Sequence, residues 1–417
     1  MPGLTLLRHA AALILLALSA AMLAPVGARA QTSQADFARF LDQDIWPQAR
    51  AAGISRATFD AAFDGVKPNL KLPDLVLPGQ APAVAEKQHQ AEFQSPAAYF
   101  REDNLRSVVG QGRTLLARHA DTLRAIERRY GVPGPIVLAV WGRESGFGAA
   151  RIPYNAFEVL GTKAWLARRK DMFRAELIAA LQIVQDGHLR VSDMKSSWAG
   201  ALGQPQFMPS KFRSLAVDFD GDGRADIWNS VPDTLASIAH YLQQSGWVAG
   251  RDWGFEANIP DNVSCTLEGP DQGRPIRDFV AAGVTRVSGR PFPTHEAQAT
   301  GFLMMPAGRM GPAFIATPNF YVIKEYNNSD LYALFIGHAA DRMAGGGAFK
   351  GGWVDVTGVS RGDVARMQER LQAMGMDVGG VDGLPGFKTR RSIGAYEASA
   401  GLRVDCWPNA ALKQKLN

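Results

Sequence analysis

Glu144 lies in the segment Gly142-Arg-Glu-Ser-Gly-Phe-Gly148, directly after the apolar run Ile136-Val-Leu-Ala-Val-Trp141. Two prolines precede that run, and proline is tolerated in the first turn of a helix. The pattern therefore predicts a buried helix that ends close to Glu144. Unpaired carbonyls at a helix C-terminus disfavour a carboxylate, so we expect this side chain to hold its proton longer than an exposed glutamate as the pH rises.

Such a carboxylic acid could serve as a general acid. Cleavage of a glycosidic bond requires one, because the leaving oxygen must receive a proton as the bond breaks. Residues 196–210 support this hypothesis, since they combine aromatic faces that pack on sugar rings with glutamine amides that bond to hydroxyls and acetamides. The alternatives are a solvated helix-end carboxylate at Glu144 and a tight turn between packed helices at residues 196–210.

Residues 218–226 have the spacing of a calcium-binding EF-hand loop, with aspartates at positions 1, 3, 5 and 9 and glycine at position 6. Position 12 is Asn229 instead of the usual glutamate, and Asp233 could complete the coordination shell. The candidate metal ligands are Asp218, Asp220, Asp222, Arg224 through its backbone carbonyl, Asp226 and Asp233. We expect structural calcium, ahead of sodium or magnesium, because four close carboxylates repel one another without a cation. The alternative is an Asp/Gly turn that binds no metal.

The elements that must position these residues are mostly helical. Apolar residues follow helical spacing at residues 37–51 and 175–184. Between about residues 253 and 321 this periodicity gives way to sequence rich in Pro, Gly and Thr, with short β-type runs such as residues 301–305. The sequence therefore predicts a mainly α domain with a small β-containing subdomain.

A glycine-rich segment, residues 344–352, predicts a flexible linker between two domains. The tail at residues 353–417 is small, so we expect a compact helical module there. Ser360 can cap its first helix, which ends by Gly375, and a second helix begins near Thr389.

Residues 1–30 have the features of a secretory signal peptide, with a basic residue, a short apolar run and the cleavage pattern Ala28-Arg-Ala30. No later segment is long and apolar enough to span a bilayer, so we expect a soluble periplasmic protein after cleavage near Ala30. Loss of Arg8 and Arg29 with this segment lowers the net charge from +5 to +3. That weak charge, without a stripe of Lys and Arg, argues against a nucleic-acid partner.

Cys265 and Cys406 are the two cysteines of the sequence. An oxidising compartment permits a disulfide between them, although they fall in different predicted domains. Two buried, inert thiols are the alternative.

The motifs together resemble the membrane-bound lytic transglycosylase B family over about residues 35 to 343. The segments that carry the resemblance are Glu144-Ser-Gly-Phe-Gly148, Arg168-Arg169, residues 200–210, the aspartate loop from Asp218, and Asn319-Phe-Tyr321 through Tyr326-Asn327. The resemblance implies a lysozyme-like, mainly α (α+β) catalytic domain at residues 31–343. It also implies no organic cofactor.

The resemblance implies a role for each site residue. Glu144 would be the single acid/base catalyst, with Ser197 and Asn327 near it to orient the acid or the substrate. The residues implied around the sugar-binding groove are Gln206, Tyr241, Tyr326 and Tyr332, and those implied to contact substrate carboxylates are Arg168 and Arg169. For the tyrosines, a half-buried packing role is the alternative.

The implied reaction is cleavage, without water, of the β-1,4 bond between N-acetylmuramic acid and N-acetylglucosamine in peptidoglycan. Glu144 would first protonate the glycosidic oxygen and then deprotonate the muramic C6 hydroxyl, which closes a 1,6-anhydro ring. The implied partners are peptidoglycan glycan strands, with cell-wall synthesis proteins as further candidates. A hydrolytic muramidase and a non-catalytic wall-binding scaffold are the alternatives.

Residues 353–417 resemble the helical peptidoglycan-binding module found at enzyme termini. The matching segments are residues 371–375, 381–383 and 386–389 together with Tyr396. Tyr396-Glu397 stands where that module usually has Phe-Gln. The implied function is wall anchoring, which raises the local concentration of substrate. A domain that merely caps the first domain is the alternative.

Overall fold

The computed structural model describes residues 34–77, 96–354 and 358–416. The predicted signal peptide, residues 1–30, lies outside the described residues. None of the helices within the described ranges combines the length and the apolar character needed to cross a membrane.

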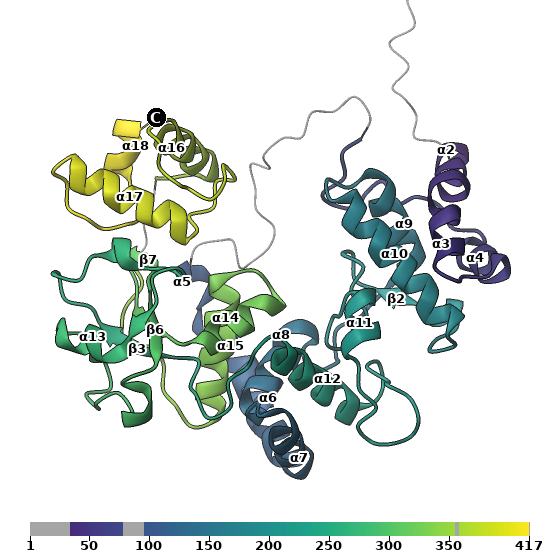
Figure 1. The fold of residues 1–417 in the computed structure, drawn as a ribbon, viewed down its shortest axis with the longest axis horizontal. Helices are drawn as coiled ribbons and strands as arrows, with labels where there is room; N and C mark the ends of the chain where they lie inside the picture. The colour runs from purple at the N-terminus through teal and green to yellow at the C-terminus, as the bar shows by residue number, and fades with distance from the viewer. Residues whose placement is uncertain (1–33, 78–95, 355–357, 417) are drawn as a thin grey trace, which may run out of the picture. The chain divides into compact units, whose positions relative to one another are not determined.

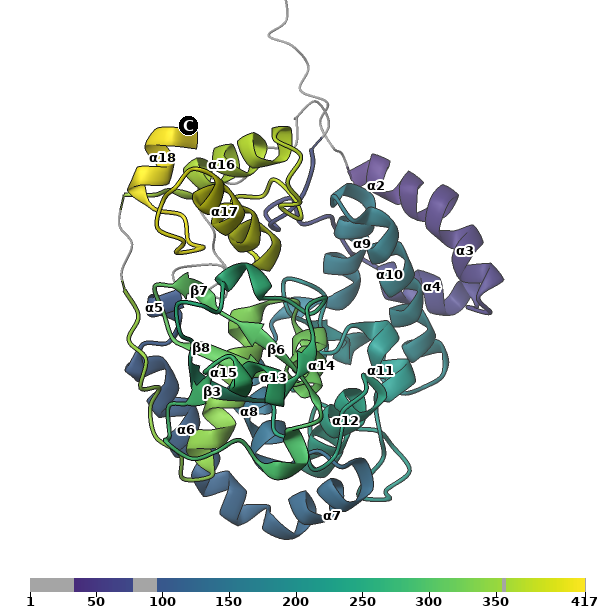
Figure 2. The ribbon, with the colours of Figure 1, turned by 60° about the vertical axis from the view of Figure 1, so that its left-hand side comes forward.

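The chain forms two compact units, a division that the sequence did not predict. Among the described residues, the smaller unit contains residues 34–77 together with Phe157–Gln185, and the larger unit contains residues 96–156, 186–354 and 358–416. Figure 1 and Figure 2 show the ribbon from two sides.

The described part of the smaller unit is helical. Its helices are α2 (Gln34–Phe40), the π-helical turn η1 (Leu41–Ile45), α3 (Trp46–Ala51), α4 (Arg56–Phe63), α9 (Ala156–Leu166) and α10 (Lys170–Gln185). Phe37 is fully buried, and its ring centroid lies 5.5 Å from that of Trp165 on α9. The helices predicted at residues 37–51 and 175–184 are therefore confirmed, with a π-helical turn inside the first.

Helices also dominate the larger unit outside its sheet and its C-terminal module, residues 353–417, which is described below. They are α5 (Pro96–Tyr99), α6 (Glu102–Arg118), α7 (Ala120–Tyr130), α8 (Gly134–Ser145), α11 (Pro209–Leu215), α12 (Val231–Gln244), α13 (Ile276–Ala281), α14 (Pro318–Tyr326) and α15 (Asp330–Met343). Short 3-10 turns occur at η3 (Val191–Asp193), η4 (Cys265–Leu267) and η5 (Thr294–Glu296).

Helix α8 lies at the centre of this arrangement and packs against α6, α12 and α15. It begins after Pro133, with a second proline in its first turn, and every residue from Ile136 to Trp141 is buried. An apolar helix of this kind is stable only when neighbours cover it on all sides. The buried helix predicted before Glu144 is therefore confirmed.

The β-containing subdomain is an antiparallel sheet with strand order β4-β6-β8-β3-β5. The strands of the larger unit are β1 (Tyr154–Asn155), β2 (Lys195–Ser196), β3 (Gly254–Asn258), β4 (Arg274–Pro275), β5 (Thr285–Arg286), β6 (Thr300–Met304), β7 (Pro306–Arg309) and β8 (Ala313–Ala316). The buried Phe255, Leu303 and Ile315 cluster with Ile276 and Phe279 of α13. The β-rich segment predicted between residues 253 and 321 is confirmed, because its strands share this one apolar face.

The C-terminal module consists of α16 (Arg361–Ala373), α17 (Phe387–Ser399) and α18 (Ala410–Leu416). Ser360 and Asp363 form a capping box at the start of α16, as predicted for Ser360. Gly375 follows the helix with φ +83°, a conformation that glycine adopts without strain. Helix α17 starts slightly before the predicted Thr389, and the small core of the module contains Met367, Leu371, Val378, Ile393, Leu412 and Leu416.

The module is attached to the rest of the larger unit by more than a linker. Cys265 and Cys406 form a disulfide, which excludes the alternative of two free thiols. The backbone N–H groups of Lys350 and Gly351 donate to the Glu256 carboxylate at 2.9 and 2.7 Å. The C-terminal end of the predicted linker is therefore bound to β3, because the Glu256 carboxylate accepts these two backbone N–H groups. The domain boundaries at 31–343, 344–352 and 353–417 remain predictions.

Candidate active site

Glu144 lies in the last turn of α8, and its side chain is half-buried. Gly146 ends the helix in the left-handed conformation, with φ +56°, and Phe147 follows with φ +59°. The Phe147 ring lies edge-to-face on Trp141 at 5.4 Å and covers Gly142, where a Cβ would stand 2.5 Å from that ring. The glycines of the motif therefore let an aromatic ring close over the helix end that carries the acid.

Tyr332 on α15 holds the Glu144 carboxyl. Its hydroxyl donates a hydrogen bond to Glu144 Oε1 at 2.5 Å, and the Tyr332 side chain is 1% exposed. Burial, reinforced by the negative charge of Glu144, raises the pKa of Tyr332 well above its ordinary value. The phenol therefore stays protonated and remains a donor to the carboxyl.

Three further aromatic rings pack next to Tyr332 in a contiguous cluster. The Tyr326 ring lies parallel to that of Tyr332 at 6.5 Å, and the Tyr241 ring lies 4.6 Å from Tyr326. Phe207 contacts both Tyr241 and Tyr326. The structure thus brings Glu144 together with all three predicted groove tyrosines, Tyr241, Tyr326 and Tyr332.

The hydroxyls of Tyr241 and Tyr326 bind backbone carbonyls. Tyr326 donates to the Pro205 carbonyl at 2.8 Å, and Tyr241 donates to the Glu325 carbonyl at 2.7 Å. Burial, followed by the charges of Glu325 and Glu144, raises the pKa of Tyr241 to about 12. Both phenols therefore fix neighbouring backbone, which agrees with a packing role for these two hydroxyls.

The segment after β2 folds back on itself through bridges that pair Leu202 with Ser196 and with Phe207. Ser197 Oγ accepts the N–H of Ala201 at 3.2 Å. Gln206 has φ +53°, and its amide nitrogen donates to the Gly203 carbonyl at 2.9 Å. This turn, which the sequence left open as an alternative to a sugar site, is present. It places Gln206 between Pro205 and Phe207, both of which contact Tyr326.

Asn327 is the residue that caps the C-terminal end of α14. Its backbone carbonyl accepts the N–H of Ser329 at 2.5 Å, in the short connection to α15. Asn327 therefore lies in the same stretch of chain as Tyr326 and Tyr332.

Gln204 is a supporting residue that sequence reasoning missed. Its Oε1 accepts Trp141 Nε1–H at 2.8 Å, and its Nε2 donates to the Trp228 carbonyl at 2.7 Å. It thereby joins α8 to the end of the aspartate loop. A half-buried bridging glutamine has no spacing signal of its own, so nothing in the sequence separates it from Gln206.

Arg168 and Arg169 form the exposed turn between α9 and α10 in the smaller unit. The Arg169 carbonyl accepts the N–H of Phe173 and so continues into α10. Their predicted contact with substrate carboxylates remains a prediction.

The aspartate loop gathers part of the predicted ligand set. Carboxylate oxygens of Asp218, Asp220 and Asp222 lie within 4.8 Å of one another. All-oxygen donors of this kind fit a hard cation such as calcium. The loop is exposed at Asp220, Asp222 and Arg224, so an ion could enter directly from solvent.

Asp226 and Asp233 lie outside that cluster of three. Asp226 Oδ1 accepts the N–H groups of Trp228 and Asn229, each at 2.9 Å. Asp233 is fully buried and accepts backbone N–H groups from both ends of the loop, at Phe219 and Asp226. These two carboxylates shape the loop from within, because buried donors need acceptors.

Residues 36–341 match the family model for the transglycosylase SLT domain, which spans most of the chain and every predicted site residue. The chain belongs to this transglycosylase family. It is 30% identical to membrane-bound lytic murein transglycosylase B of Escherichia coli over 278 residues, which are 64% of this chain and 73% of that protein.

Solved structures extend this similarity to the whole fold. SltB3 from Pseudomonas aeruginosa in complex with NAG-anhNAM-pentapeptide has a TM-score of 0.81 at 39% identity, covering 91% of this transglycosylase and 99% of SltB3. The SltB3 complex with NAG-NAM-pentapeptide gives the same TM-score at 40% identity and the same coverage. Escherichia coli Slt35 in complex with calcium has a TM-score of 0.54 at 25% identity, covering 75% of this chain and 93% of Slt35.

These similarities confirm the predicted family, the mainly α lysozyme-like fold and the enzyme class. The transglycosylase is a lytic enzyme of peptidoglycan, so the scaffold alternative is excluded.

Proposed function

We propose that Glu144 is the single acid/base catalyst with which this lytic transglycosylase cuts glycan strands and forms 1,6-anhydromuramic acid. The observation that carries the assignment is the 2.5 Å hydrogen bond from the buried Tyr332 hydroxyl, which holds the carboxyl at the end of α8. The two SltB3 complexes, with NAG-NAM-pentapeptide and NAG-anhNAM-pentapeptide, support this substrate and this product.

Glu144 acts twice in the proposed reaction. As an acid, it gives its proton to the glycosidic oxygen while the bond to muramic C1 breaks. As a carboxylate, it then takes the proton of the muramic C6 hydroxyl, whose oxygen attacks C1 and closes the anhydro ring. The proton thus returns to Glu144, no water is consumed, and no second carboxylate is required. Tyr332 keeps one carboxyl oxygen in place through both steps.

The neighbouring residues bind and orient the substrate. Ser197 and Asn327 orient the acid or the sugar, while Gln206 and the rings of Tyr241 and Tyr326 line the groove. Support comes from the contacts that join Tyr241, Tyr326 and the Gln206 turn to Tyr332. Arg168 and Arg169 contact substrate carboxylates as charge partners.

The aspartate loop holds a structural calcium ion through Asp218, Asp220 and Asp222, with sodium as the second candidate. A bound cation neutralises carboxylates that otherwise repel one another. The oxygen cluster of this loop and the calcium complex of Slt35 support the proposal.

The enzyme works in the periplasm after removal of residues 1–30, and residues 353–417 bind peptidoglycan. The signal-like sequence and the relatives named for murein support the compartment. Residues 371–375, 381–383 and 386–389 together with Tyr396 carry the resemblance of the module.

The test is digestion of purified peptidoglycan by the mature enzyme and by Glu144→Gln, followed by mass spectrometry of the released muropeptides. We expect anhydro ends from the wild type and none from the variant. The matched control is Glu127→Gln, which removes an exposed glutamate of α7 and should digest like the wild type. Reducing ends from the wild type would favour a muramidase, and equal release by Glu144→Gln would remove Glu144 as the catalyst.

A further inference from the structure

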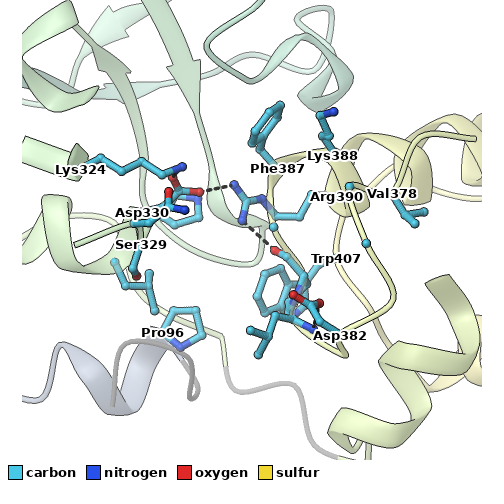
Figure 3. A pocket seen from close by; sticks show the side chains of 18 residues that line it. Pro96, Lys324, Ser329, Asp330, Val378, Asp382, Phe387, Lys388, Arg390 and Trp407 are labelled. Carbon is cyan, nitrogen blue, oxygen red and sulfur yellow. Dashed lines mark hydrogen bonds and ion pairs between the residues drawn. The ribbon is translucent and has the colours of Figure 1, made fainter. Parts of the chain in front are cut away.

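The C-terminal module contacts the stretch of chain that carries the site. Asp330, the first residue of α15, receives Lys324 Nζ from α14 at 2.7 Å and Arg390 Nη2 from α17 at 3.2 Å. Figure 3 shows Lys324 and Arg390 approaching Asp330 from opposite sides, beside a cavity of about 260 Å³. One carboxylate thus joins both helices of the site to the module.

Arg390 is almost fully buried, with its side chain 4% exposed, and it reaches two acids. Its Nε donates to Glu268 Oε1 at 2.5 Å while its Nη2 donates to Asp330. Burial opposes ionisation of Asp330, yet the charges of Lys324 and Arg390 hold the pKa of its carboxyl below its ordinary value. These buried ion pairs hold Arg390, Glu268 and Asp330 in fixed positions, because separating them would leave a buried charge without a partner, which costs free energy.

The first turn of α15 connects Asp330 to the catalytic acid. Ser329 caps this turn, and its Oγ accepts the N–H of Tyr332 at 3.4 Å. Tyr332, within the same turn as Asp330, donates to Glu144. A displacement of this turn would therefore move the hydroxyl that holds the carboxyl.

We propose that Arg390 is a positioning residue for the reaction: through Asp330 it fixes the first turn of α15, and through Tyr332 it holds Glu144 in place. The inference rests on the proposed role of Glu144. In this proposal the C-terminal module helps to position the catalytic acid, a function separate from wall anchoring.

The test variant is Arg390→Lys, which keeps the charge but loses the planar fork that reaches Glu268 and Asp330 together. The matched control is Arg391→Lys on the same helix, where Arg391 is partly exposed and pairs with Asp271 at 2.7 Å. Both enzymes are assayed on a soluble NAG-NAM tetrasaccharide, which offers no wall to which a module could anchor.

We expect Arg390→Lys to lower kcat about 10-fold with KM within about twofold of the wild type, because the acid is misplaced while the groove is unchanged. Arg391→Lys should match the wild type. An unchanged kcat in Arg390→Lys would overturn the inference, and so would a change confined to KM, which would indicate substrate binding by the module. If the melting curve shows that Arg390→Lys does not fold, Asp330→Asn tests the same link, and wild-type kcat in that variant would overturn it.

Glu144→Gln in the same assay separates the two proposals. An active Glu144→Gln enzyme would contradict the proposed function itself. An inactive Glu144→Gln enzyme together with wild-type kcat in Arg390→Lys would contradict only the role of Arg390.

Discussion

The Tyr332 hydroxyl donates a hydrogen bond to the Glu144 carboxyl. Tyr332→Phe keeps the buried ring but leaves the carboxyl without this donor. We expect kcat on a soluble glycan to fall about 10-fold, which corresponds to about 1.4 kcal/mol of barrier, close to the lower end of the range for a hydrogen bond to a charged group.

The matched control is Tyr130→Phe, because the buried Tyr130 hydroxyl has no hydrogen-bond partner in the part of the chain that the structure describes. This variant should keep the wild-type kcat. Wild-type turnover in Tyr332→Phe would show that another group orients the acid.

His338 on α15 should make the fold sensitive to acid. Its ring is buried and lies 3.6 Å from the Phe349 ring, and burial, aided by the charge of Arg342, lowers its pKa from the ordinary 6.5 to about 4. Between pH 6.5 and pH 4, His338 therefore binds a proton in the unfolded chain but stays neutral in the folded chain. Titration of His338 therefore leaves the free energy of unfolding unchanged above pH 6.5 and lowers it progressively as the pH falls from 6.5 toward 4.

We expect urea unfolding at pH 5 to give a free energy roughly 2 kcal/mol below the value at pH 7 from this group alone, since each pH unit costs about 1.4 kcal/mol. His338→Leu cannot titrate, so its loss between pH 7 and pH 5 should be smaller by that amount. Equal losses in both proteins would mean that other groups set the acid sensitivity.

At the scale of elements, the aspartate loop and α8 are coupled. The Gln204 side chain accepts a hydrogen bond from Trp141, which lies one turn before Glu144 on α8. It also donates a hydrogen bond to the backbone carbonyl of Trp228, which follows Asp226. The loop therefore stabilises the helix that carries the acid, through Gln204 and Trp141.

Calcium should stabilise the enzyme through this loop. At a calcium concentration of 100 times Kd, we expect the free energy of unfolding to exceed its value in chelator by about 2.7 kcal/mol. Asp220→Asn should reduce this gain, because it removes one charged ligand. Asp261→Asn, at a fully exposed aspartate outside the loop, should keep it. Titration calorimetry and melting curves measure both effects, and equal melting in calcium and chelator would argue against the metal site.

At the scale of the whole molecule, the disulfide and the buried Arg390 ion pairs make the C-terminal module part of the larger unit. The disulfide spans 141 residues of sequence. Closing so long a loop removes much of the conformational freedom of the unfolded chain.

We therefore expect Cys265→Ser with Cys406→Ser to lower the free energy of unfolding by about 4 kcal/mol in denaturant titrations. Reduction of the wild-type disulfide should give a similar loss. A double variant as stable as the wild type would show that the ion pairs and apolar contacts alone hold the module.

The sequence determined the parts whose signals are local. Apolar spacing and the flanking prolines and glycine predicted α8 and the position of Glu144 at its end, and Ser360 predicted the cap of α16. The dense motifs around Glu144 and residues 200–210 sufficed for the family and the reaction class. Such features depend on neighbours within a few residues, where backbone preference and periodicity act.

The tertiary structure decided which distant groups meet. Only the folded chain brings Tyr332 to Glu144, Gln204 to Trp141 and Arg390 to Asp330, in three hydrogen bonds. It also brings Cys265 to Cys406, which form the disulfide. It also left Asp226 and Asp233 to hold the backbone of the aspartate loop rather than to join the oxygen cluster. These contacts join residues brought together by packing, and packing depends on the shape of the whole core, which no local pattern encodes.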